Sequence, residues 1–136
     1  MQVEKGDVLC LWAGLDRMIL SMNKQPDASL KEACAVLGGH DKRLLQWITD
    51  SGIAAIASDN LAGENVGRAV PDCCTSTLPL HEHCLFKLGI HLGELWHLAE
   101  LAEWLWLHGR NRFMLTAPPL RLTGAVGSPV TPVATV

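Results

Sequence analysis

The fold is decided by one stretch of this 136-residue chain, Gly52-Ile53-Ala54-Ala55-Ile56-Ala57-Ser58-Asp59-Asn60. Ile53 to Ala57 is a short apolar run that begins after a turn residue, which is typical of a strand covered on both faces. The polar residues that follow stand at the carboxyl end of the strand, where open α/β sheets place ligand-contacting loops. Asp59 and Asn60 are equally explained as a turn and cap pair, whereas in the functional interpretation Asp59 supports the active-site loop.

Helices and strands are expected to alternate on both sides of this stretch. Asp7–Ala13 is a second apolar run of strand length. Asp41 is a candidate N-cap for a helix over residues 42–48 that Ser51-Gly52 closes. Ser29 and Glu32 form a capping-box pattern at the start of a helix over residues 29–37. The remaining expectations are helices over residues 18–22, 81–88 and 95–108, a loop over 61–79, strands over 90–94, 112–117 and 120–122, and an extended tail over 127–136. Such alternation indicates an α/β fold.

The composition favours one domain without nucleic-acid or membrane partners. The length suits a single domain over residues 1–136, since domains most often have about 100–150 residues. Eleven basic and 14 acidic residues give a net charge of −3, and the basic residues are scattered, which argues against nucleic acid. The first residues lack a signal-peptide pattern, and no stretch reaches the roughly 18 apolar residues of a membrane helix. We therefore expect a cytoplasmic protein.

The cysteines and tryptophans are explained most simply by structural roles. An odd number of cysteines without metal-knuckle spacing is expected to remain as reduced thiols, namely Cys10, Cys34, Cys73, Cys74 and Cys84. With 49% hydrophobic and only 18% charged residues, the chain has more apolar surface than a lone domain hides, so we expect oligomerisation or a larger assembly. Trp96, Trp104 and Trp106 are expected in the core or at a subunit interface. His97 and Glu100 are expected on the exposed face of a helix.

Glu94 is the candidate site residue that the local pattern indicates. Ile90 and Leu92 are alternate residues of an expected buried strand, and continuing that period places Glu94 on the same face. A carboxylate there needs a compensating charge, because burial raises the pKa of an unpaired one by up to about 3–5 units. A divalent metal, with His81 thirteen residues upstream as a second ligand, would supply that charge. The simpler alternatives are a helix N-terminal acid for Glu94 and a capping or solvated residue for His81.

Four ordered blocks resemble the carboxyl-terminal part of the cyclase family, which includes bacterial kynurenine formamidases and isatin hydrolases. The resemblance extends from about Gly6 to the end of the chain. The blocks are Trp47-Ile48 with Ser51–Asn60, Leu78–His81, Leu88-Gly89-Ile90 with Leu92-Gly93-Glu94, and Gly124–Val130 with Pro132-Val133-Ala134.

The resemblance implies a swivelling β/β/α fold, here incomplete at its amino-terminal side, and a hydrolase that depends on zinc or manganese. One histidine and one glutamate ligand come from the carboxyl-terminal half of that fold, and they match His81 and Glu94. The family's pair is usually twelve residues apart rather than thirteen, so His83, eleven residues before Glu94, is the other candidate. His81 is favoured because Pro79-Leu80-His81 keeps the family's local context.

The family's amino-terminal ligand motif, His-x-Gly-Thr-His-x-Asp-x-Pro-x-His, does not occur in this sequence. Two ligands are too few for a hydrolytic metal site, which needs at least three. We therefore expect the carboxyl-terminal part of a family member, working with a missing amino-terminal half or as a homo-oligomer. Two hypotheses follow. The first is a metal-dependent hydrolase that uses a metal-activated water on an aryl amide, formamide, lactam or related ester bond of a small molecule. The second is a truncated, non-catalytic remnant or assembly partner.

Overall fold

The computed structural model describes residues 1–31, 33–65 and 76–136. These residues form two compact units, Met1–Ala99 and Glu100–Val136. In the part of the chain that is described, no helix is both long and apolar enough to cross a membrane.

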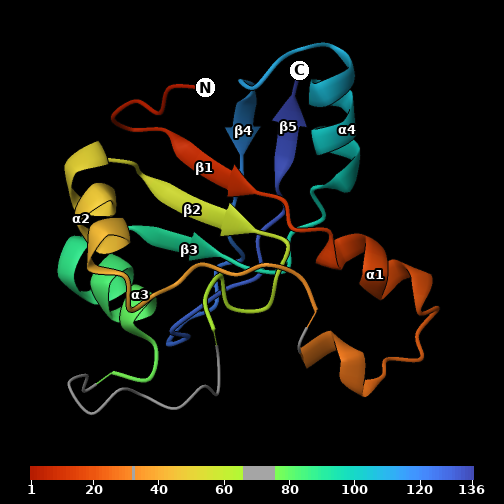
Figure 1. The fold of residues 1–136 in the computed structure, drawn as a ribbon, viewed down its shortest axis with the longest axis horizontal. Helices are drawn as coiled ribbons and strands as arrows, with labels where there is room; N and C mark the ends of the chain where they lie inside the picture. The colour runs from red at the N-terminus through yellow and green to blue at the C-terminus, as the bar shows by residue number, and fades with distance from the viewer. Residues whose placement is uncertain (32, 66–75) are drawn as a thin grey trace. The chain divides into compact units, whose positions relative to one another are not determined.

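The first unit is built on a three-stranded parallel sheet in the order β1 (Val8–Leu11), β2 (Ala55–Ser58) and β3 (His91–Gly93). Leu9 of β1 pairs with Ile56 of β2, and Ile56 pairs with Leu92 of β3. The three arrows point the same way, with helices between them along the chain (Figure 1). The strands expected over residues 7–13, 53–57 and 90–94 overlap these three strands, and the α/β class is confirmed.

Helix α2 (Lys42–Ser51) leads into the central strand and has the caps that the sequence predicts. The Asp41 carboxylate accepts a hydrogen bond from the backbone N–H of Arg43 at 2.8 Å. At the other end Gly52 has φ 65°, a left-handed conformation that glycine adopts at little cost and that ends the helix.

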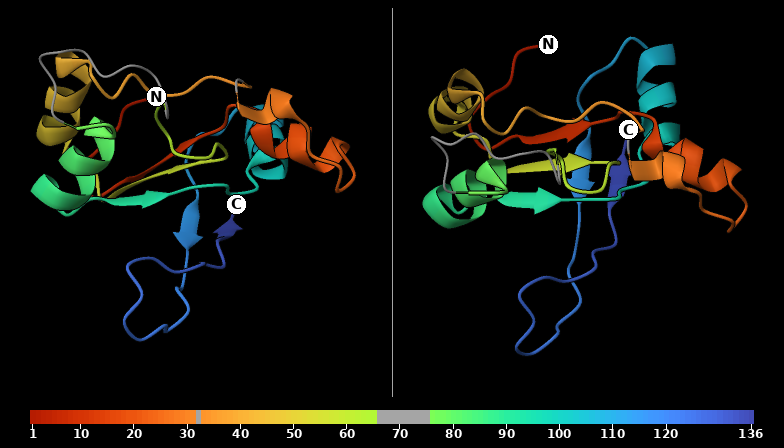
Figure 2. Two further views of the ribbon diagram at one scale, coloured as in Figure 1. Left: turned by 90° about the horizontal axis from the view of Figure 1, so that it is seen from below. Right: turned by 60° about the horizontal axis from the view of Figure 1, so that its bottom comes forward.

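The segment before β3 is helical as well. Helix α3 (Pro79–His81) continues directly into the π-helical segment η2 (Glu82–Leu88). Together the two elements cover the predicted helix over residues 81–88. This segment lies beside α2 in Figures 1 and 2, and Thr49 Oγ1 is 2.9 Å from His83 Nε2. Between these elements and the sheet lies the core of buried apolar side chains, Ile48, Ile53, Ile56, Leu80, Cys84 and Ile90.

The predicted helix over residues 29–37 is wrong. Only one 3₁₀ turn forms there, η1 (Ala28–Lys31). Cys34 has φ 68°, a left-handed conformation that a side-chain-bearing residue does not adopt inside a right-handed helix. Glu32, the second member of the expected capping box, lies outside the described residues.

Two other helices have different bounds from those expected. The helix predicted over residues 18–22 is α1 (Leu15–Ser21), which begins three residues earlier. The helix predicted over residues 95–108 is α4 (Ala99–Leu107), because Leu95 adopts a left-handed φ of 55° and the chain remains irregular until residue 99.

In the second unit the tail forms the second strand of a small antiparallel sheet. β4 (Met114–Thr116) pairs with β5 (Val133–Thr135), and a long loop joins them (Figure 2). The strand predicted over residues 120–122 is wrong, because the loop there has only an isolated bridge between Pro119 and Val130.

The described cysteines carry free thiols. Burial raises the pKa of Cys10 and of Cys84 to about 11 in each case, so both thiols are neutral at physiological pH. Cys34 is exposed, and Cys73 and Cys74 lie outside the described residues.

Candidate functional site

Asp59 anchors the loop between β1 and α1. Its side chain is fully buried at the carboxyl end of β2. The carboxylate accepts hydrogen bonds from the backbone N–H groups of Ala13 at 2.8 Å, Gly14 at 2.7 Å and Asp16 at 3.4 Å. Because the side chain has no exposed surface, Asp59 supports this loop and does not itself face a ligand.

Asp16, at the start of α1, holds the first residues of α4. Its Oδ2 accepts hydrogen bonds from the backbone N–H groups of Leu98 at 2.9 Å and Ala99 at 2.7 Å. Burial raises the pKa of Asp16, but hydrogen bonds from the Trp12 indole and from Ala99 lower it more, so that it lies below the usual 3.8. Asp16 is thus ionised at neutral pH and satisfies N–H groups that the helix itself leaves unpaired.

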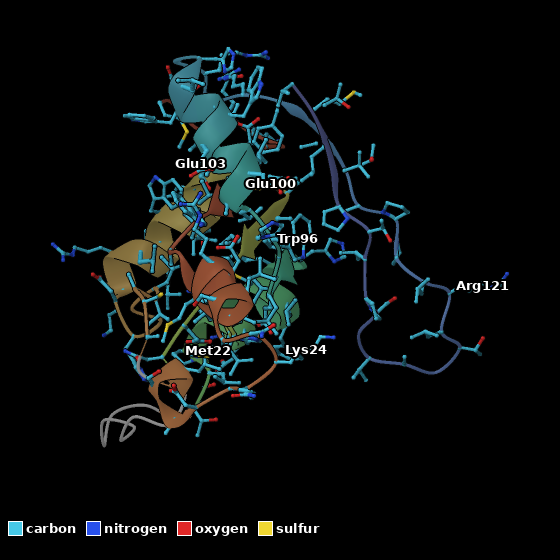
Figure 3. All side chains as sticks on the ribbon, turned by 90° about the vertical axis from the view of Figure 1, so that its right-hand side faces the viewer. Met22, Lys24, Trp96, Glu100, Glu103 and Arg121 are labelled. Atoms are coloured by element: carbon cyan, nitrogen blue, oxygen red, sulfur yellow. The ribbon has the colours of Figure 1, made fainter. Side chains whose placement is uncertain are left out.

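His97 is exposed, as expected, but the expectation that it lies on a helix is wrong. His97 precedes α4, and its Nδ1 lies 3.1 Å from Asp16 Oδ2. Glu100, by contrast, is in the first turn of α4 and is exposed as expected (Figure 3).

The segment after β3 is held against the end of β2 by backbone hydrogen bonds. Leu95 N–H donates to the Asn60 carbonyl at 3.1 Å, and Trp96 N–H donates to the Ser58 carbonyl at 3.0 Å. The Trp96 ring, labelled in Figure 3, packs so closely on Gly93 that a Cβ there would lie 2.8 Å from a ring carbon. These contacts fix the backbone on both sides of Glu94.

Glu94 and His81 meet across this edge of the first unit. His81 Nε2 lies 2.9 Å from Glu94 Oε1, and 22% and 34% of the two side-chain surfaces are exposed. The prediction that Glu94 is buried with Ile90 and Leu92 is therefore wrong, because β3 ends at Gly93 and the alternation does not continue. The partner of the carboxylate is the imidazole, so desolvation gives no argument for a metal.

His83 is directed elsewhere. Its Nε2 lies beside Thr49 on α2, while His81, two residues earlier, contacts Glu94. Of the two histidines that the sequence leaves as alternatives, the structure brings His81 to the glutamate.

Glu64 is a site residue that the sequence analysis missed. Its side chain is 1% exposed, and its Oε1 lies 2.8 Å from His81 Nδ1. The same carboxylate accepts the backbone N–H groups of Leu80 and His81, each at 3.0 Å. Glu64 lies within residues 61–79, where the sequence shows little periodicity, so no local signal marks it. The result is a row of three side chains, Glu64, His81 and Glu94.

The distance between His81 Nε2 and Glu94 Oε1 suits two ligands of one cation. Two ligands about 2.0–2.1 Å from one metal ion lie roughly 2.8–3.4 Å apart, with octahedral geometry at the short end and tetrahedral geometry at the long end. The 2.9 Å between His81 Nε2 and Glu94 Oε1 falls within this range. A neutral imidazole carries one N–H, whereas both ring nitrogens here face a carboxylate oxygen, so one of these contacts requires a second proton or a metal cation.

His81 and Glu94 can therefore supply two metal ligands, but not a complete site. In residues 1–31, 33–65 and 76–136, no group of three or more histidine, cysteine, aspartate or glutamate side chains is arranged to hold a metal ion.

We expect Gly39→Ala to destabilise the protein by about 1–3 kcal/mol, the usual cost of overpacking a filled space. An added Cβ would lie 2.0 Å from Glu64 Oε2 and 3.1 Å from a Pro79 side-chain carbon. Urea denaturation measures this change. Gly38→Ala is the matched control, because a Cβ at Gly38 meets nothing within 4 Å. Equal midpoints for the two variants would show that the space around Glu64 is not filled.

The fold and the site define an α/β protein with a carboxylate–histidine–carboxylate row near the carboxyl edge of a parallel sheet. A solved structure described as that of a novel cyclase is similar over 99% of this chain, with a TM-score of 0.77 and 32% sequence identity. By structure the chain belongs to the cyclase family, and the resemblance noted in the sequence is confirmed. The chain spans 42% of the length of that cyclase, so it corresponds to part of such a protein. No family model and no curated protein gives a significant match.

Proposed function

We propose that this chain is the carboxyl-terminal part of a metal-dependent hydrolase with the swivelling β/β/α fold of the cyclase family. His81 and Glu94 would be two ligands of a zinc or manganese ion, and the bond cleaved would be an aryl amide, formamide, lactam or related ester. One observation carries the proposal. His81 Nε2, from helix α3, and Glu94 Oε1, from the segment that follows β3, lie 2.9 Å apart, and the buried Glu64 carboxylate lies behind the imidazole.

When bound, the metal ion would supply hydroxide near neutral pH and polarise the carbonyl that is attacked. The residues of this chain would bind the metal ion, accept a hydrogen bond from the attacking water and support the neighbouring loops. His81 would bind the metal ion through Nε2. Glu94 adds negative charge and has a second carboxylate oxygen that can accept a hydrogen bond from the attacking water. Asp59 and Asn60 hold the neighbouring loops in place.

We also propose that the chain works with a second polypeptide, either another copy or a complementary amino-terminal half. Large apolar side chains that are mostly exposed in each unit support this, with Phe86 and Trp106 each 85% exposed. Further ligands would then come from that second polypeptide, as would part of the pocket for a small-molecule substrate.

A non-catalytic remnant or assembly partner is the second candidate. It is favoured by the number of potential metal ligands. In the described part of the chain, His81 and Glu94 come together, but no group of three or more such side chains does.

Metal analysis combined with an activity assay separates the two candidates. The hydrolase is expected to hold about one zinc or manganese ion per chain and to hydrolyse N-formylkynurenine or a related aryl amide, with activity lost on chelation and restored by the metal. Protein that stays metal-free after incubation with either ion, and leaves these substrates intact, would support the remnant.

A further inference from the structure

We propose that Glu64 is a positioning residue that fixes the proton of the His81 ring on Nδ1 and so directs Nε2 toward Glu94 and the cation. The part of this inference that concerns the cation rests on the proposed function. The part that concerns the imidazole stands on hydrogen-bond geometry alone.

The two oxygens of Glu64 are fully engaged as acceptors. Oε2 accepts the Leu80 N–H at 3.0 Å, and Oε1 accepts the His81 N–H at 3.0 Å. Because both oxygens already accept backbone N–H groups, the ring nitrogen 2.8 Å from Oε1 is assigned as the donor of this third hydrogen bond. Nδ1 therefore carries a hydrogen, and the nitrogen that faces Glu94 is Nε2.

Burial makes this arrangement rigid. The Glu64 side chain is 1% exposed, and its carboxylate lies directly against the backbone of Gly39. Since the same carboxylate binds the backbone of His81 and its ring, it fixes both the position of the residue and the rotation of the imidazole. In metal sites, a carboxylate behind a histidine ligand orients the ring and raises its basicity, and its loss typically lowers metal affinity 10–100-fold.

The decisive variant is Glu64→Ala, compared with Glu82→Ala as a control of the same charge change. Glu82 follows His81 in the chain, but its side chain is partly exposed and its carboxylate pairs with Lys87 at 2.8 Å. We expect Zn²⁺ titration to show a 10–100-fold weaker affinity for Glu64→Ala and unchanged affinity for Glu82→Ala. Equal affinities for wild type and Glu64→Ala would overturn the inference.

A spectroscopic measurement on the wild-type protein covers the case in which Glu64→Ala does not fold. Nitrogen-15 NMR of the histidine rings is expected to show a proton on His81 Nδ1 both without metal and after zinc is added. An unprotonated Nδ1 in either state would overturn the inference. Glu64→Gln keeps one acceptor oxygen for the ring, and is expected to retain this proton and most of the zinc affinity.

The same experiments separate the inference from the proposed function. If the wild-type protein binds no zinc even when the second polypeptide is present, the hydrolase proposal fails. A Nδ1 proton that persists in wild type and Glu82→Ala but is lost in Glu64→Ala then still establishes the positioning role.

Discussion

Replacement of Asp59 with alanine is expected to lower the free energy of unfolding by about 3–5 kcal/mol. The carboxylate has no exposed surface and accepts three backbone N–H groups, those of Ala13, Gly14 and Asp16. Each buried donor left without a partner costs about 1–3 kcal/mol. These residues form the β1–α1 loop, and Asp16 in turn holds the start of α4, so the loss extends beyond one loop. Urea denaturation followed by circular dichroism measures it.

Asp50→Ala is the control for this prediction. Asp50 is exposed near the end of α2, where its carboxylate accepts one surface hydrogen bond from Gln46. Surface substitutions of this kind usually change stability by no more than about 0.5 kcal/mol. If the Asp59 variant lost no more stability than the Asp50 variant, the loop would not depend on the buried carboxylate.

Replacement of His81 with alanine is expected to weaken zinc binding by more than about 100-fold. Loss of a supporting residue alone typically costs 10–100-fold, and His81 is proposed as a direct ligand. Glu94→Ala should have a similarly large effect, because its Oε1 is the donor atom beside His81 Nε2. Titration with Zn²⁺ against a competing chelator measures both affinities, and any hydrolytic activity should disappear with them.

His83→Ala tests the choice between the two histidines. His83 lies two residues away and contacts Thr49 instead of Glu94, so its variant should bind zinc as tightly as wild type. A large loss in His83→Ala together with a small loss in His81→Ala would reverse the assignment.

The elements that the sequence predicts well are those with local causes. Helix α2 has an acceptor at Asp41 and a left-handed residue at Gly52, both adjacent to it in the chain. The buried strand before Ser58-Asp59-Asn60 is an apolar run of strand length, and the observed β2 differs from it only in its bounds. Short-range patterns of this kind are sufficient when the neighbouring residues decide the conformation.

The features that the sequence did not predict depend on contacts between residues that are far apart in the chain. The start of α4 depends on Asp16, more than 80 residues earlier, and no pattern near residue 99 shows this. Glu94 was expected to need a buried counter-charge, whereas its exposed position and its contact with His81 arise from how the chain leaves β3. Glu64 was missed because its hydrogen bonds reach 16 and 17 residues along the chain.

The pair of candidate ligands itself came from the resemblance to a family and from the alternation before Glu94. Spacing alone left His81 and His83 open, and the choice between them required the three-dimensional contacts.

The most direct test of the central claim, that His81 and Glu94 share a metal ion, is anomalous diffraction at the zinc edge from crystals grown with Zn²⁺. The claim predicts one strong peak about 2.0–2.2 Å from both His81 Nε2 and a Glu94 carboxylate oxygen. A zinc peak only at other side chains, with His81 Nε2 and Glu94 Oε1 still in direct contact at 2.9 Å, would contradict it.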